Sequence, residues 1–268
     1  MNTEKQDTLK IVAIIQARMG SSRLPGKVME DIAGMPMIAW VVKRAQLSEK
    51  ISRVMIATTD DPNDYPIEHW CNQNKVQSYR GSVFDVLDRF YQAAKSIKAD
   101  IIVRLTADCP LIDPVVIDQV IDMFENENAD FAANRLPPPY HRTYPIGLDV
   151  EVVSFKALEQ AWHEAHHKFE REHVLPYLYS EKGRFNVSIL DAEKDFGALR
   201  WTVDTPEDLE FLRALAAQMD FSLNTRWLEI LDFLEAHPEL ALINADVQHK
   251  SMTDIDARAN GDQEQKHV

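Results

Sequence analysis

The sequence predicts an α/β fold with a mainly parallel, mixed β-sheet and helices on both faces of that sheet. Short apolar runs alternate along the chain with segments whose apolar residues recur at helical spacing. The runs are almost wholly apolar, as in strands that are covered on both faces. Alternation of this kind is typical of strand–helix–strand units, which place their strands parallel.

Strands and helices alternate through the first half of the chain. The run at Ile11–Gln16 predicts a buried strand. A helix is expected at residues 83–97, where one apolar face holds Val86, Leu87, Phe90, Tyr91, Ala94 and Ile97. The other elements expected here are a helix at Met37–Ala45, a strand at 53–57, a short helix at 66–74, a short strand at 77–79 and a strand at 101–105.

The second half continues the pattern with shorter strands. A helix is expected at residues 114–127, because proline is favourable in the first turn. After Phe131–Ala133 and a proline-rich loop at 136–140, we expect strands at 149–153, 185–190 and 199–203 and helices at 155–167, 170–181, 206–219 and 225–237. We therefore divide the chain into a domain at 10–220, a helical extension at 221–247 and a disordered tail at 248–268, which is polar.

Composition and charge limit the class of ligand. The chain has 268 residues, of which 45% are hydrophobic and 27% charged, as in an ordinary globular protein. Its net charge of −14 argues against general binding of nucleic acid. Residues 11–27 differ, since they carry Arg18, Arg23 and Lys27 and no acidic residue. Such a basic island suits a compact anion such as a nucleotide.

The expected location is the cytoplasm. Cys71 and Cys109 are far apart and match no metal-binding spacing. Residues 1–10 have no apolar signal region, and no run of about 18 apolar residues could cross a membrane. We therefore expect a reduced protein that does not bind membranes.

The loop after the first strand, residues 16–27, is the strongest candidate for a phosphate site. Gly20 and Gly26 let backbone N–H groups approach a ligand closely, and Arg18, Arg23 and Lys27 can neutralise a triphosphate. The loop is not a Walker motif, because five residues separate the two glycines and valine follows the lysine. The alternative is a solvated basic loop.

Two aspartates follow predicted strands and should meet at one edge of the sheet. Asp108 comes just after the strand at 101–105, and Asp204 follows the strand at 199–203. Ligands of such sheets bind beyond the carboxyl ends of the strands, and Mg²⁺ takes one or two carboxylates together with phosphate oxygens. Alternatively, Asp204 or Thr205 caps the helix that begins at Pro206, and Asp108 is a turn residue before Pro110.

For several further polar residues, the sequence is consistent with either a role in the site or a structural role. Asp149 and Glu151 could contact a metal or a sugar hydroxyl, and the turn at residues 80–82 could frame a base or a sugar instead of being a capped turn. The segment at 171–176, which holds Glu172 and His173, is either a helix start or a substrate contact.

Residues 163–167 match the zinc-protease pattern H-E-x-x-H. The apolar residues of this helix are Phe155, Leu158, Trp162 and Ala165, so His163 and His167 fall at its solvated end. We therefore do not expect a zinc site there.

Three motifs in this order resemble the sugar-activating cytidylyltransferases, which include the enzymes that make CMP-Kdo and CMP-sialic acid. They are A-R-x-x-S-x-R-L-P-G-K at 17–27, D-x-P at 108–110 and V-D-T-P-E-D-L at 203–209. Residues 143–152 and 171–176 are more similar to the branch of spore coat polysaccharide synthesis proteins. The resemblance covers about residues 10–215. It departs from the Kdo enzymes at Ala107, where they usually have glycine, and at residues 80–89, which do not match their S-G-T-[DE]-R pattern.

The resemblance implies a Rossmann-like nucleotidyltransferase fold, CTP as donor, Mg²⁺ and a homodimer. It implies that Arg18, Ser22, Arg23 and Lys27 bind the CTP phosphates and that Asp108 and Asp204 hold the metal. Together with the residue patterns, it predicts a nucleotide site of Gln16, Ala17, Arg18, Gly20, Ser22, Arg23, Lys27, Arg80, Gly81, Ser82, Thr106 and Ala107, and an acceptor site of Tyr144, Asp149, Glu151, Glu172 and His173.

The expected reaction transfers CMP from CTP to an acidic sugar or a related acceptor and releases pyrophosphate. Arg18, Arg23, Lys27, Asp108 and Asp204 are the expected catalytic residues. Two other classes stay open. One is a glycosyltransferase that uses a nucleotide sugar, with Asp149 and Glu151 as its metal pair. The other is a non-catalytic nucleotide-binding protein.

Overall fold

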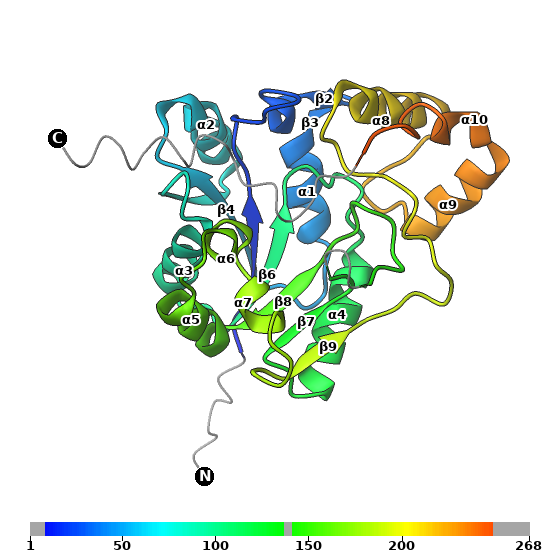
Figure 1. Cartoon of the computed structure of the whole chain (residues 1–268). Coiled ribbons are helices and arrows are strands. Elements are labelled where there is room, and N and C mark those ends of the chain that lie inside the picture. Colours follow the sequence, from blue (N-terminus) through cyan, green and yellow to red (C-terminus); the bar gives the residue numbers. More distant parts are fainter. Residues whose placement is uncertain (1–8, 137–140, 249–268) are drawn as a thin grey trace, which may run out of the picture.

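The computed structural model describes residues 9–136 and 141–248, and these form a seven-stranded mixed sheet flanked by helices (Figure 1). The strand order is β5-β4-β1-β6-β8-β7-β9. The first four strands are parallel to one another, whereas β8 runs antiparallel to both β6 and β7. The strands are β1 (Ile11–Gln16), β4 (Arg53–Thr59), β5 (Gln77–Gly81), β6 (Ile101–Thr106), β7 (Phe131–Ala133), β8 (Glu151–Ser154) and β9 (Val187–Ile189), with a separate small pair of β2 (Asp31–Ile32) and β3 (Met35–Pro36).

Helices cover both faces of the sheet, because alternate residues of the central strands face two separate apolar clusters. In β1, Ala13 and Ile15 belong to the cluster that also holds α1, α4, α8 and α9. Val12 and Ile14 belong to the cluster with α3, α5 and α7. The helices are α1 (Met37–Ala45), α2 (Tyr65–Asn74), α3 (Val86–Ile97), α4 (Pro114–Asn126), α5 (Phe155–Glu164), α6 (Lys168–His173), α7 (Pro176–Tyr179), α8 (Pro206–Gln218), α9 (Trp227–Ala236) and α10 (Pro238–Ala241), with single 3₁₀ turns at Lys27–Met29 and Pro62–Asp64. The predicted fold class is confirmed.

The strand expected at residues 199–203 is wrong. This segment makes one isolated bridge, between Ile146 and Arg200. Its backbone amides instead donate to loops, from Trp201 to Ile146 O at 2.7 Å and from Val203 to Asp108 O at 2.8 Å. The segment therefore crosses the edge of the sheet as a loop, and it still brings Asp204 next to Asp108.

Several predicted boundaries shift for local reasons. The helix expected at 170–181 is broken into α6 and α7 at Val174, whose φ of 75° cannot continue a helix. The helix expected at 155–167 ends at Glu164, and the strand expected at 185–190 is shortened to Val187–Ile189. The strand expected at 77–79 extends to Gly81.

The C-terminal extension packs into the same core as the rest of the chain. Side chains of α9 and α10, including Trp227, Ile230 and Leu240, join the cluster that covers α1 and α4. Arg44 of α1 is fully buried and donates to the backbone carbonyls of Ser222, Leu223 and Thr225, which fixes the start of the extension. Residues 137–140 of the expected proline-rich loop and residues 249–268 of the expected tail lie outside the described residues.

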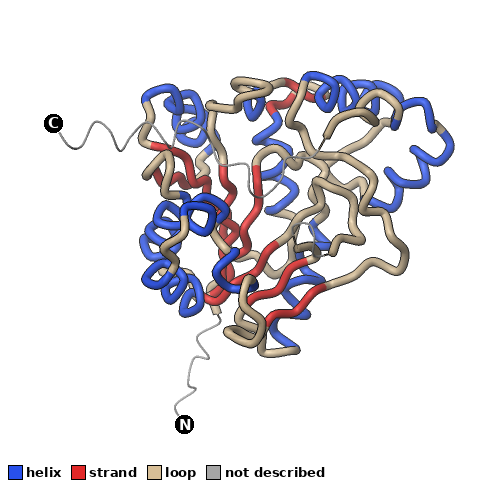
Figure 2. The backbone as a smooth tube through the Cα atoms, viewed as in Figure 1, coloured by secondary structure: helices blue, strands red, loops and turns tan. Residues whose placement is uncertain are grey.

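The carboxyl ends of β1 and β6 point to the same edge of the sheet and give way there to loops (Figures 1 and 2). Among the described helices, none combines the length and apolar character that crossing a membrane requires.

Candidate active site

The loop after β1 is held in a defined shape by a hydrogen bond within its backbone and by the Asp64 carboxylate. Gly26 N–H donates to Met19 O at 2.8 Å, and Gly26 has a φ of 76°, which favours glycine. The buried Asp64 carboxylate accepts from Met19 N at 2.6 Å and from the Thr59 hydroxyl at the end of β4. The loop is therefore fixed to two strand ends before any ligand binds.

Lys27 lies between the two aspartates that the sequence placed at this edge. Its Nζ donates to Asp108 Oδ2 at 2.6 Å, to Asp204 Oδ1 at 2.8 Å and to Val203 O at 2.8 Å. Only 7% of the residue is exposed. Burial alone would lower the pKa of Lys27, but the charges of Asp108 and Asp204 outweigh burial and raise it. Lys27 is therefore a permanently charged group at neutral pH.

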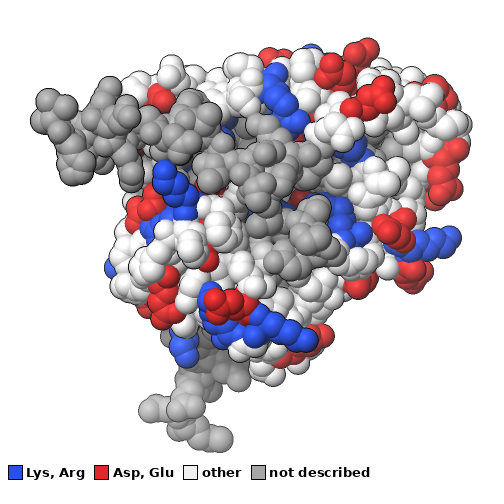
Figure 3. Space-filling model, viewed as in Figure 1, with Lys and Arg blue, Asp and Glu red and all other residues white. Residues whose placement is uncertain are grey.

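Among the described residues, three cationic side chains form ion pairs with the Asp204 carboxylate. Besides Lys27, its carboxylate pairs with Arg23 Nη2 at 3.0 Å and with Arg200 Nη2 at 2.9 Å. Burial would raise the pKa of Asp204, but these cations outweigh burial and hold it well below its ordinary value. On the part of the face in Figure 3 that the described residues form, basic side chains likewise lie beside acidic ones.

A cavity of about 210 Å³ brings together most of the residues that the sequence predicted for the nucleotide and the metal. Its walls come from the loop after β1, the end of β6 and the loop before α8. It is lined by Gln16, Ala17, Arg18, Ser21, Ser22, Arg23, Lys27, Val28, Thr106, Ala107, Asp108 and Asp204. The predicted convergence of the three cations with Asp108 and Asp204 is therefore present.

Two neighbouring cavities share Arg18 with the first one. A cavity of about 440 Å³ is lined by Arg18, Gly20 and residues at the end of β4, such as Thr59 and Asp61. A smaller one, of about 150 Å³, is lined by Gln16, Arg18, Val83, Phe84, Val86, Arg104, Glu172 and His173. The structure thus places Glu172 and His173 beside the predicted nucleotide residues.

The turn at residues 80–82 makes structural contacts in this molecule, and its predicted nucleotide contact stays a prediction. The Arg80 guanidinium donates to Thr59 O and Asp61 O and pairs with Glu68. It also stacks over the Tyr65 ring at 4.2 Å. Gly81 pairs with Thr59 in the sheet, and Ser82 Oγ accepts from Asp85 N at 3.0 Å at the start of α3. These groups hold β5 and α3 in place.

Three of the predicted acceptor residues are also engaged elsewhere. Tyr144 is buried in the core against Trp227, with ring centroids 5.6 Å apart. Asp149 pairs with Arg142, and the buried Glu151 pairs with Arg104. Both carboxylates also contact Arg135, at 3.4 and 3.8 Å. The Asp149–Glu151 pair is therefore saturated with arginines and does not present a metal site, as the glycosyltransferase alternative would need.

The H-E-x-x-H match has no zinc-site geometry. α5 ends at Glu164, so His163 and His167 do not share a helical face, and both are exposed. His167 instead caps α6. Among the residues that the structure describes, no group of three or more histidine, cysteine or acidic side chains gathers as a metal-binding cluster.

The Asp108–Asp204 pair does fit Mg²⁺. This ion keeps several waters and takes only one or two protein carboxylates when it also binds phosphate. Both carboxylates are partly exposed, with side-chain exposures of 26% and 22%, and both line the cavity. The Lys27 ammonium shows that the pair already stabilises a positive charge between its oxygens.

Sequence reasoning missed the residues that support this pair. Asp208 is fully buried and binds Arg200 at 2.8 Å, and Asn244 donates to the same carboxylate at 2.9 Å. A signal existed only for Asp208, which is the third residue of α8 and forms a capping box with Thr205. Arg200 and Asn244 carry no local pattern.

The chain is similar to known proteins over most of its length. A family model described as cytidylyltransferase matches residues 12–230. The chain is 32% identical over 238 residues to the spore coat polysaccharide biosynthesis protein SpsF of Bacillus subtilis (86% of this chain, 96% of that protein). It is 39% identical over 116 residues to a 3-deoxy-manno-octulosonate cytidylyltransferase of Trichlorobacter lovleyi (43% and 45%). The structure of a cytidylyltransferase from Leptospira borgpetersenii covers 90% of this chain and 100% of its own, with a TM-score of 0.83 and 31% identity. This chain belongs to the cytidylyltransferase family.

Proposed function

We propose that this protein transfers CMP from CTP to an acidic sugar or a related acceptor and releases pyrophosphate. The observation that carries the proposal is the convergence of Lys27, Asp108 and Asp204 in one cavity with Arg18 and Arg23. Three cations beside two carboxylates match the needs of a triphosphate and its magnesium ion. The family supports CTP as the nucleotide.

In this reaction an acceptor hydroxyl oxygen bonds to the α-phosphorus and gives up its proton. The bond between the α-phosphorus and the oxygen that bridges it to the β-phosphate breaks, so pyrophosphate leaves. The protein contributes position and charge rather than covalent chemistry. Arg18, Arg23 and Lys27 neutralise the triphosphate and the leaving pyrophosphate. Asp108 and Asp204 would hold Mg²⁺, which when bound supplies further positive charge beside the reacting phosphate. The buried, charged Lys27 contacts both carboxylates.

We assign the acceptor to the cavity that Glu172 and His173 share with Arg18 and Arg104. This cavity adjoins the nucleotide site through Gln16 and Arg18, which line both. Two arginines and a histidine suit the carboxylate of an acidic sugar, and the Glu172 carboxylate suits a hydroxyl. The similarity to a 3-deoxy-manno-octulosonate cytidylyltransferase over part of the chain supports this acceptor class.

The decisive experiment measures pyrophosphate release with each of the four nucleoside triphosphates, Mg²⁺ and a panel of acidic sugars. We expect release with CTP and at least one sugar acid, and a loss of several hundredfold in Asp108→Asn. The exposed Asp220→Asn serves as the matched control. Binding of CTP without turnover on the whole panel would instead indicate a non-catalytic nucleotide-binding protein, and near-normal turnover of Asp108→Asn would refute the metal role.

A further inference from the structure

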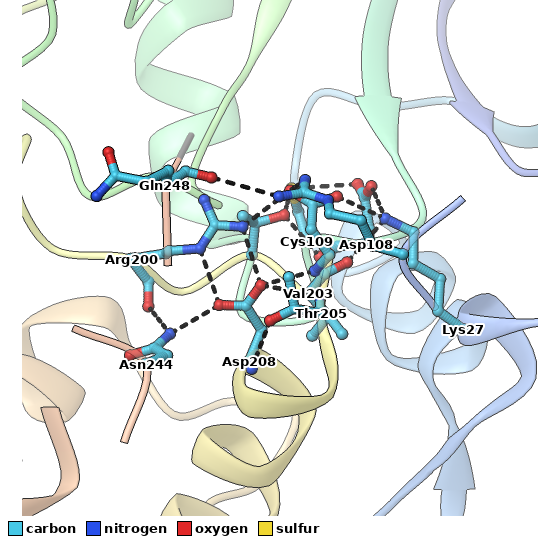
Figure 4. Close-up of polar contacts among 12 residues, drawn as sticks. Lys27, Asp108, Cys109, Arg200, Val203, Thr205, Asp208, Asn244 and Gln248 are labelled. Atoms are coloured by element: carbon cyan, nitrogen blue, oxygen red, sulfur yellow. Dashed lines mark hydrogen bonds and ion pairs between the residues drawn. The ribbon is translucent and has the colours of Figure 1, made fainter. Parts of the chain in front are cut away.

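We propose that Asn244 is a positioning residue that holds Asp204 in its working orientation from the far side of the site. Asn244 lies in the turn after α10, outside the segment that the family model matches, and only 4% of it is exposed. Its Nδ2 donates to Arg200 O at 3.1 Å and to Asp208 Oδ1 at 2.9 Å (Figure 4). One amide group therefore clamps both members of the Arg200–Asp208 ion pair.

That ion pair in turn fixes Asp204 at two points. The Arg200 guanidinium uses Nε and Nη2 on Asp208, at 2.8 and 2.9 Å, and the same Nη2 reaches Asp204 Oδ2 at 2.9 Å. Asp208 Oδ2 accepts from the backbone N–H of Asp204 at 2.9 Å. The backbone and the carboxylate of Asp204 are thus both tied to the pair that Asn244 holds.

Asp208 is the centre of this arrangement, since it is fully buried and accepts hydrogen bonds from four residues: Arg200, Asp204, Thr205 and Asn244. Such a carboxylate is stable only while its donors stay in place. Without the Asn244 amide, Asp208 Oδ1 keeps one donor among the described residues, and the buried carbonyl of Arg200 loses a hydrogen bond. Both members of the pair then gain freedom to move.

The contact between Arg200 and Asp204 matters because the other cations that contact Asp204 are also assigned to another ligand. Lys27 and Arg23 hold Asp204 from the basic loop, and both are assigned above to the phosphates of CTP. Once they engage the phosphates, Arg200 is the cation of this set that still orients Asp204. Removal of an outer contact of this kind typically weakens the affinity of a metal site by roughly 10–100-fold.

The C-terminal segment also touches the basic loop directly. The backbone carbonyl of Gln248 accepts from Arg23 Nη1 at 3.3 Å. The C-terminal segment therefore contacts two of the arginines that bind Asp204. Asn244 contacts Arg200, and Gln248 contacts Arg23.

The inference rests on the proposed metal role of Asp204, so the test separates the two. Binding of Mn²⁺ to the full chain without nucleotide is titrated by the EPR signal of free Mn²⁺, for wild type, Asp204→Asn, Asn244→Ala and the control Asp246→Asn. Asp246 is exposed and lies two residues beyond Asn244. We expect roughly tenfold weaker binding in Asn244→Ala, wild-type binding in the control, and loss of the site in Asp204→Asn.

Steady-state rates give the second readout. Asn244→Ala should lower kcat roughly tenfold and leave the KM for CTP within twofold, because the nucleotide contacts are intact. Wild-type Mn²⁺ affinity and kcat in Asn244→Ala, with the site lost in Asp204→Asn, would overturn the inference alone. Binding that Asp204→Asn leaves unchanged would overturn the proposed metal role and the inference with it. If Asn244→Ala melts below the assay temperature, Asn244→Ser, which keeps a shorter donor, should show an intermediate loss.

Discussion

The Nζ atom of Lys27 lies 2.6 Å from Asp108 Oδ2, although the two residues are 81 positions apart in the sequence. The same atom reaches Asp204 at 2.8 Å. An ammonium group therefore occupies the space between two carboxylates that we assign to Mg²⁺. On that assignment the lysine and the metal ion would compete for the same oxygens, and this competition can be measured.

Lys27→Met removes the ammonium and leaves a neutral side chain of similar length. Binding of Mn²⁺ without nucleotide should tighten several-fold, because the two carboxylates lose their internal cation and repel each other. Release of pyrophosphate from CTP should nevertheless fall at least about a hundredfold, because a charge beside the reacting phosphate is gone. EPR titration and a coupled pyrophosphate assay measure the two effects.

The exposed Lys43→Met, on α1, is the control and should change neither quantity. Weaker Mn²⁺ binding in Lys27→Met would show that the lysine supports the metal site instead of competing for it.

Arg23→Ala and Arg80→Ala should separate a ligand contact from a structural one. Arg23 lines the cavity of the predicted triphosphate site, so its loss should raise the KM for CTP roughly tenfold with a smaller change in kcat. Arg80 holds the carbonyls of Thr59 and Asp61, so its loss should lower the melting temperature and leave KM unchanged. Steady-state kinetics and thermal melts decide this, and a raised KM in Arg80→Ala would instead support its predicted nucleotide contact.

The sequence was sufficient for the fold class because the signal is local. Val12 and Ile14 face one apolar cluster and Ala13 and Ile15 the other, as an unbroken apolar run predicts for a strand covered on both faces. The convergence of Lys27 with two distant aspartates was also predictable, since loops beyond parallel strands share one edge of the sheet. The resemblance of three motifs to the cytidylyltransferases is confirmed by the family model.

The contacts that the sequence could not predict depend on partners far along the chain. Asn244 meets Asp208 across 36 positions, through a turn that has no periodic pattern. Arg80 lies near the carboxyl end of β5, where ligand contacts are expected, but its side chain donates to the Thr59 carbonyl. Residues 199–203 have strand-like composition, yet they pair with a loop at Ile146 instead of a strand.

Asp208→Asn should make the free energy of unfolding less dependent on pH. Burial raises the pKa of Asp208, but hydrogen bonds from Arg200, Asn244 and the Asp204 backbone outweigh burial and lower it. The carboxylate therefore stabilises the fold above its unfolded pKa of about 4, and this contribution is lost as pH falls through the lower folded value. At pH 7 the variant should lose roughly 3–5 kcal/mol, the cost of breaking a buried ion pair.

Urea unfolding at pH 7, 5 and 3 tests this dependence. The difference between wild type and Asp208→Asn should be largest at pH 7 and should shrink toward pH 3. Asp220→Asn, at an exposed position, should show little difference at any of the three pH values. A deficit that stays constant from pH 7 to 3 would mean that the ionised carboxylate is not its source.

Gly147→Ala should disturb the loop that positions Asp204. Gly147 has a φ of 112°, and a Cβ there would lie 2.7 Å from Thr202 N and from the Trp201 carbonyl carbon. Both atoms belong to the backbone and cannot rotate away, so residues 201–204 must shift. Strain and overlap together should cost about 3 kcal/mol of unfolding free energy.

Gly34→Ala separates the two effects, because its φ is 82° but a Cβ there meets no atom within 4 Å. It should cost only about 1–2 kcal/mol and leave pyrophosphate release unchanged, whereas Gly147→Ala should slow it. Equal rates in both variants would show that the position of Asp204 does not depend on this close backbone contact.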